Sequence, residues 1–143
     1  MNILVETGRF EGVDVDVLRS GVLRTLSAED RDVVELSLTL LADEEIRELN
    51  RRYLGHDRPT DVIAFTLGGP EDLVGDVYVG VEQARRQAEE LGISPSEELL
   101  RLAVHGTLHV LGHDHPEGEE RYASPMFEQQ ERIVRDVLER GGM

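Results

Sequence analysis

Four of the five histidines in this chain of 143 residues lie within eleven residues, from position 105 to position 115. His105 and His109 are four residues apart, so a helix would place both imidazoles on one face, about one turn from each other. Gly112 follows, and glycine reaches the left-handed conformation that ends a helix at no side-chain cost. The turn would bring His115 back towards the first two histidines, and the stretch therefore predicts a cluster of three imidazoles.

Three neutral imidazoles with one coordination position left open are typical of a catalytic zinc site, whereas structural zinc sites are closed by four protein ligands, usually including thiolates. The chain has no cysteine. We therefore predict one Zn2+ per chain, bound by His105, His109 and His115. If the helix continued through Gly112, His113 would replace His115, because residues four apart share a helix face.

The helices of metalloproteases that read His-Glu-x-x-His share this arrangement of ligands, and in one branch a glycine and a third histidine follow at the same offsets. Their glutamate activates the attacking water. Here Gly106 stands in its place. The metal ligands are kept and the protease base is lost, so a metallopeptidase-like hydrolase is the weaker alternative.

The alternation of apolar and polar residues predicts an α/β (α+β) fold: one domain over residues 1–143, with a mixed β-sheet of about four strands and surrounding helices. The clearest strand has a period of two, formed by Val34, Leu36, Leu38 and Leu40. Strands are expected at residues 1–6, 33–40, 62–65 and 75–80, and helices at 13–26, 42–53, 81–91, 99–111 and 126–138, with a turn at 116–118.

The helix that carries the histidines is expected to lie buried in the middle of this domain. Ser94 stands three residues before Glu97, and Pro95 occupies the first helical position, which are two signals of a helix start. From residue 99 to residue 111 the chain is apolar on nearly all sides. A metal motif on a buried central helix is held rigidly, as catalysis requires, and the arrangement resembles a zincin-like metallohydrolase.

The charge of the chain bears on its partners. A net charge of −15, from 30 acidic and 15 basic residues, disfavours a polyanionic partner on average. A local basic run stands against this average, formed by Arg47, Arg51, Arg52, His56 and Arg58. We predict that Arg51, Arg52 and Arg58 bind substrate; the alternative is an ordinary solvated helix face.

These residues resemble the YbeY family of bacterial endoribonucleases, or rRNA maturation factors. The strongest match is His-Gly-Thr-Leu-His-Val-Leu-Gly-His-Asp-His at residues 105–115, which includes the glycine after the first histidine. A second block begins with Asn50 and Tyr53 and continues as Asp-Arg-Pro-Thr-Asp-Val at residues 57–62. Residues 75–77 and 126–127 match more weakly. The resemblance covers most of the chain.

The resemblance implies a single-strand-specific, metal-dependent endoribonuclease with a zinc-bound three-histidine site. It also implies a cytoplasmic location, ribosomal RNA and the small ribosomal subunit as partners, and roles in 16S rRNA 3' end maturation and small-subunit quality control. A zinc-stabilised ribosome assembly factor without physiological cleavage is the alternative. No organic cofactor is expected, and no membrane association, because no segment approaches the roughly 20 apolar residues of a membrane span.

The chain departs from the family at two positions. Many members place an arginine directly after the tyrosine of the second block, in a cleft near the metal where it meets RNA phosphate, but this chain has Leu54. Either Arg51, Arg52 or Arg58 takes over this contact, or this branch handles its substrate differently. Thr66 stands where the family commonly has proline, which is expected to affect only the end of a strand.

The expected chemistry is hydrolysis of a phosphodiester. Zinc supplies a water nucleophile at neutral pH and polarises a phosphodiester oxygen, while an arginine would balance the developing charge. His105 and Asp114 are the candidate catalytic residues. Asp114, next to His113, is either the general base or, as we prefer, a group that orients a metal-bound imidazole. Asp61 and Asp76 are expected to be structural acceptors at strand ends.

Overall fold

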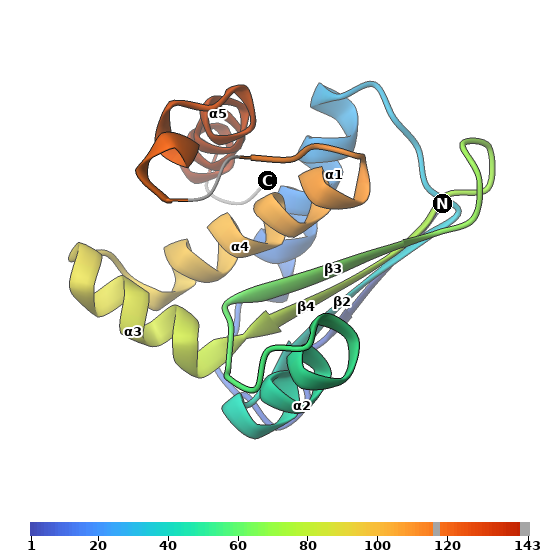
Figure 1. Cartoon of the computed structure of the whole chain (residues 1–143). Helices are drawn as coiled ribbons and strands as arrows, with labels where there is room; N and C mark the ends of the chain where they lie inside the picture. The colour runs from blue at the N-terminus through green and yellow to red at the C-terminus, as the bar shows by residue number, and fades with distance from the viewer. Residues whose placement is uncertain (116–117, 141–143) are drawn as a thin grey trace.

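A four-stranded mixed sheet, in the order β1-β2-β4-β3, forms one layer of the molecule. Neighbours β1 (Asn2–Glu6) and β2 (Glu35–Leu41) are parallel, and so are β2 and β4 (Val74–Gly80). The edge strand β3 (Val62–Leu67) is antiparallel to β4. This computed structural model describes residues 1–115 and 118–140 (Figure 1).

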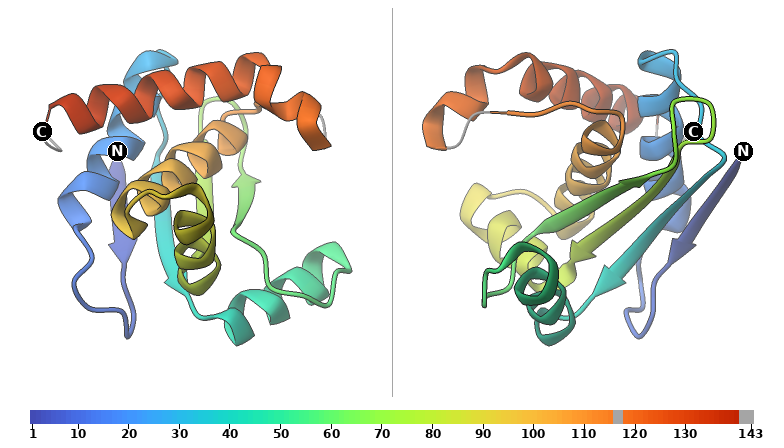
Figure 2. Two further views of the ribbon diagram at one scale, coloured as in Figure 1. Left: turned by 90° about the vertical axis from the view of Figure 1, so that its left-hand side faces the viewer. Right: turned by 45° about the vertical axis from the view of Figure 1, so that its right-hand side comes forward.

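Most helices gather on one face of this sheet (Figures 1 and 2). They are α1 (Val15–Ala28), α3 (Val81–Leu91), α4 (Pro95–Val110) and α5 (Pro125–Glu139), with a short 3-10 helix η1 (Gly118–Ala123) before α5. Helix α2 (Asp43–Leu54) lies beyond the ends of the strands, near Gly80. Within the described ranges, no helix is both long and apolar enough to cross a membrane. The predicted mixed sheet, surrounding helices and central helix are confirmed.

Strand β2 shows the predicted alternation, with one correction. Leu36, Leu38 and Leu40 are buried against the helices. Val34, which was expected on the same face, is 52% exposed, and Val33 is buried instead. The reason is that the strand begins only at Glu35, so the period of two does not yet govern Val34.

Helix α4 occupies the centre of the helical layer. It begins as the sequence predicts, because the Ser94 hydroxyl accepts a hydrogen bond from the Glu97 N–H at 3.1 Å and Pro95 occupies the first turn. Leu100 and Leu108 are fully buried. The helix contacts α1, α3, α5, β3 and β4, and its burial on most sides explains its nearly continuous apolar sequence.

Glycines allow α4 to lie unusually close to its neighbours. A Cβ atom at Gly106 would stand 2.4 Å from Cγ1 of Val77 in β4. A Cβ atom at Gly75 of β4 would stand 2.6 Å from Cγ1 of Val110. Both separations are too short for carbon atoms, so the helix rests against the strand only because these side chains are absent.

Two predictions about the fold stay untested, wholly or in part. The turn expected at residues 116–118 includes residues 116 and 117, which lie outside the described residues. That residues 1–143 form one domain stays a prediction.

Replacing Gly106 by alanine is expected to lower the free energy of unfolding by about 1–2 kcal/mol. The clash with Val77 costs about 1–3 kcal/mol as overpacking, while the better helix propensity of alanine returns up to about 1 kcal/mol. Urea denaturation measures the difference. Gly69→Ala is the matched control, because a Cβ atom there meets nothing within 4 Å. A Gly106→Ala protein as stable as this control would contradict the close packing.

Candidate metal centre

Three histidines lie together at the C-terminal end of α4, as the sequence predicts. The candidate ligand atoms of His105, His109 and His115 all lie within 4.8 Å of one another. The Nε2 atoms of His105 and His109 are 3.0 Å apart, and the ring of His115 is centred 5.0 and 5.2 Å from the other two rings. This group of imidazoles could bind a metal ion.

A glycine turn brings the third histidine back. Helix α4 ends at Val110, and Gly112 has a φ of +99°, in the region that favours glycine. The Gly112 N–H donates to the carbonyl of His109, and the His113 N–H donates to the carbonyl of Leu108, both at 3.0 Å. These two bonds are those of a Schellman motif. The predicted turn at Gly112 is therefore confirmed.

The turn sends the side chain of His113 away from the cluster. Its Nε2 contacts the carboxylate of Glu29, just after α1. Burial raises the pKa of Glu29, but hydrogen bonds from His113 and Gln129 outweigh it and leave that pKa lowered. The continuous stripe of His105, His109 and His113 does not form, because the helix does not pass through Gly112.

The two helical histidines are oriented by acceptors behind them. Nδ1 of His105 is 2.5 Å from Oε1 of Gln130 on α5, and Nδ1 of His109 is 2.9 Å from the carbonyl of His113. Because both partners are acceptors, we assign the ring proton to Nδ1 in each case. The Nε2 lone pairs are then free to bind a metal, the usual arrangement behind histidine ligands.

Gln130 was missed in the sequence analysis, although a signal exists. This side chain is only 4% exposed. It falls at helical spacing among the buried apolar residues of α5, which are Met126, Ile133, Val134 and Val137. A glutamine at a core-facing position must find a partner, but its partner could not be read from α5 alone.

Burial keeps the imidazoles of His105 and His109 neutral. It lowers the pKa of His105 to about 4, against opposition from the Gln130 hydrogen bond. Burial also lowers the pKa of His109, opposed by the His113 carbonyl. Neutral imidazole is the form that binds metal, so both residues are in the right protonation state at pH 7.

The predicted acidic residues have different positions. The carboxylate of Asp114 accepts the backbone N–H of His115 at 2.8 Å, which stabilises the turn. His105 and His109 are oriented by Gln130 and a backbone carbonyl, and both roles considered for Asp114, orienting an imidazole and acting as general base, stay predictions. Asp76 accepts from the Ser37 hydroxyl at 2.8 Å, as a structural residue would. Asp61, also expected to be structural, lines the cavity beside the histidines.

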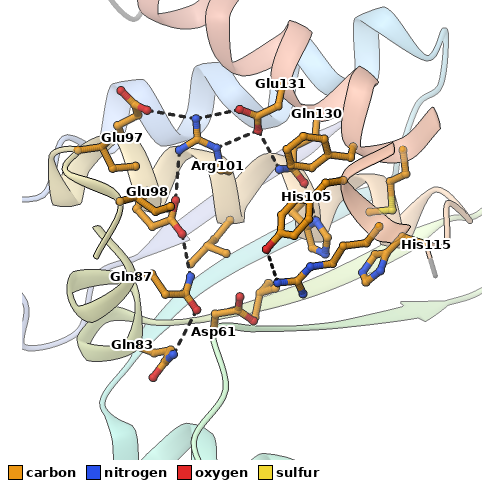
Figure 3. A pocket seen from close by; sticks show the side chains of 18 of the residues that line it. Asp61, Gln83, Gln87, Glu97, Glu98, Arg101, His105, His115, Gln130 and Glu131 are labelled. Atoms are coloured by element: carbon orange, nitrogen blue, oxygen red, sulfur yellow. Dashed lines mark hydrogen bonds and ion pairs between the residues drawn. The ribbon is translucent and has the colours of Figure 1, made fainter. Parts of the chain in front are cut away.

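A cavity of about 680 Å3 opens beside the histidines, lined by residues of α3, α4, η1, α5 and the start of β3. Figure 3 shows His105 and His115 towards one end and Glu97 and Glu98 at the other, with Arg101 between them. Asp61 lies between α3 and the histidines. The cavity is large enough to hold part of a substrate chain.

The predicted substrate-binding arginines lie elsewhere. On α2, Arg51 and Arg52 form ion pairs with Glu48, and Arg47 pairs with Asp57. Arg51, Arg52 and Arg58 are exposed and are not among the residues that line the cavity. The geometry fits the solvated helix face better, and their role in substrate binding stays a prediction.

The family model and the named relatives agree on one family. The family model described as "Endoribonuclease YbeY" matches residues 10–138. A Sulfurihydrogenibium protein named Endoribonuclease YbeY is 46% identical, over 77% of this chain and 74% of its own length. One of the same name from Caldanaerobacter subterraneus is 38% identical, over 94% and 96%. The solution structure of TM1509 from Thermotoga maritima is similar, with a TM-score of 0.67 and 32% identity, covering 97% of this chain and 91% of that one.

Replacing Gln130 by methionine, which is similar in size but whose thioether is only a weak acceptor, is expected to weaken metal affinity roughly tenfold to a hundredfold, because His105 loses the group that orients it. Competition titration against a chromophoric chelator measures the change. Gln129→Met is the matched control, since Gln129 bonds to Glu29 and not to a histidine of the cluster. Equal affinities in the two variants would show that Gln130 does not orient the site.

The metal-free protein is expected to lose stability as the pH falls from about 6.5 towards 4. In this range an unfolded histidine binds a proton, whereas His105, with a folded pKa of about 4, does not. One such group contributes a slope of up to about 1.4 kcal/mol per pH unit. Urea unfolding with chelator at several pH values measures it. The slope should shrink in His105→Asn and persist in His56→Asn, at an exposed site.

Proposed function

Since this chain belongs to the YbeY family of endoribonucleases, we propose that it is a zinc-dependent endoribonuclease that hydrolyses single-stranded ribosomal RNA. The observation that carries the proposal is the convergence of three imidazoles, two of them kept neutral by burial, beside a cavity that can admit a nucleotide chain. By the same resemblance we propose action on the 3' end of 16S rRNA, in the cytoplasm, and a part in quality control of the small ribosomal subunit.

One zinc ion per chain is proposed at His105, His109 and His115. Three imidazoles with an open position suit catalytic zinc, although nickel, copper and iron also accept imidazole ligands. The bound ion supplies a water nucleophile at neutral pH and a positive charge near the phosphodiester. The protein holds the first two ligands through Gln130 and the His113 carbonyl.

Asp61 is a second candidate for the general base, beside Asp114. It lines the cavity together with the three histidines. Its negative charge also acts on His105, whose pKa it raises against the larger effect of burial. A carboxylate in this position can accept a proton from an attacking water, whereas Asp114 is engaged with the backbone of the turn.

The structure explains why the metallopeptidase alternative is the weaker one. In that arrangement a glutamate follows the first histidine and reaches the water. Here the corresponding position is Gly106, which faces Val77 of the sheet and has no room even for a Cβ atom. A glutamate there would displace α4 from the sheet.

Metal removal should abolish cleavage while the fold persists. We expect about one zinc per chain by elemental analysis, and loss of cleavage of a 3'-extended 16S rRNA fragment after chelation. His109→Ala should reduce cleavage roughly a hundredfold or more, because the positive charge and the nucleophile are lost together. Circular dichroism should change little in both cases.

His56→Ala is the control, because His56 is the one histidine outside the motif and is exposed. It should cleave like the original protein. Cleavage that survives chelation would rule out the three-histidine mechanism. Unfolding on metal removal would instead favour the zinc-stabilised assembly factor, in which the ion maintains the fold.

A further inference from the structure

The described lining of the cavity includes two arginines, one surrounded by carboxylates and one with no carboxylate partner among the described residues. Arg101 lies one helical turn before His105 on α4 and donates to Glu97, Glu98 and Glu131 at 2.8 to 3.2 Å (Figure 3). Burial lowers its pKa, but the three carboxylates outweigh this and leave the pKa raised. Three negative charges around one guanidinium make the part of the cavity around Arg101 net acidic. It would repel a phosphate rather than bind one.

Arg121 lines the same cavity from η1, which begins three residues after His115. Within residues 1–115 and 118–140 no carboxylate pairs with it. Its Nη2 donates to the hydroxyl of Tyr122 at 2.8 Å, and its Cζ lies 4.9 Å from the centre of that ring. A guanidinium has five N–H donors, and among the described residues Tyr122 takes one of them.

An aromatic pair holds Arg121 at the cavity. The ring of Tyr122 packs edge to face on Phe127 of α5, with centroids 5.2 Å apart and planes at 90°. Tyr122 and Phe127 both line the cavity with the histidines. The guanidinium is therefore oriented by a hydrogen bond and a cation–π contact before any substrate binds, which reduces the entropy lost on binding.

The basic run on α2 does not compete for this role. Arg51 and Arg52 are paired with Glu48 outside the cavity. Leu54 is 51% exposed and carries no charge. The described part of the cavity wall thus contains two arginines, and of these only Arg121 has no carboxylate partner among residues 1–115 and 118–140.

We propose that Arg121 binds a phosphate of the single-stranded RNA substrate next to the three-histidine site, with Tyr122 as its positioning residue. The inference rests on the proposed function. The phosphates of the bound strand would then lie beside the histidines and Arg121. They would lie away from the three glutamates around Arg101. Arginine suits the contact because its planar fork matches two phosphate oxygens.

The test compares Arg121→Gln with Arg132→Gln, which removes the same charge from an exposed position of α5 outside the cavity. Steady-state cleavage of a labelled single-stranded 16S rRNA oligonucleotide gives kcat and KM. Fluorescence anisotropy of the same oligonucleotide, before cleavage, gives the salt dependence of binding. Metal content and circular dichroism verify that both variants are folded and loaded.

In Arg121→Gln, we expect KM to rise about tenfold with kcat little changed, as for a contact made equally in ground and transition states. The slope of log affinity against log salt should fall in magnitude by about 0.7, the value for one phosphate contact on a single strand. Arg132→Gln should change neither quantity. Arg121→Lys should keep the salt slope and recover part of the KM, because it restores the charge without the fork.

An Arg121→Gln protein with the KM and salt slope of the Arg132→Gln control would overturn the inference while leaving the proposed function intact. If the original protein failed to cleave RNA, the proposed function would fail, but the salt slope would still decide the role of Arg121. A smaller slope in Arg121→Gln alone would then support a phosphate contact, and an unchanged slope would reject it.

Discussion

The direct packing of α4 on β4 is the contact on which the rest of the structure depends. Gly106 lies against Val77, and Val110 lies against Gly75, so the helix sits on the sheet without intervening side chains. At roughly 100° per residue, positions 105 and 109 are turned roughly 60–100° from position 106 around the helix. The two imidazoles therefore project sideways, towards α5 and the cavity, and not into the sheet.

The same packing explains the chemistry available to the site. A residue that follows the first histidine is buried in the interface with the sheet, so a protease-type base has no place there. Carboxylates reach the cavity from other segments: Asp61 precedes β3, and Glu131 comes from α5. The histidines are buried enough to stay neutral, and Gln130 completes the site from a helix that follows the motif. The site is thus assembled from residues of several elements that pack around α4.

An acidic protein can bind RNA only through its local field. The net charge of −15 opposes a polyanion at long range, and the arginines of α2 are largely neutralised by neighbouring acids. What remains at the cavity is the three-histidine cluster, which could bind a metal ion, together with Arg121. Salt screens the repulsion from charges more than about 10 Å away, so the groups that contact the RNA directly decide whether it binds.

The sequence by itself determined the local features. The cap at Ser94, the end of α4 before Gly112 and the return of His115 follow from residues close to each other in the sequence, because caps and turns are short-range interactions. Only the tertiary structure decided that Gln130, Asp61 and Arg121 accompany the histidines. These residues come from separate elements whose distances depend on how α5, η1 and β3 pack around α4. No local pattern specifies that packing, since it depends on burying the apolar faces of all these elements together.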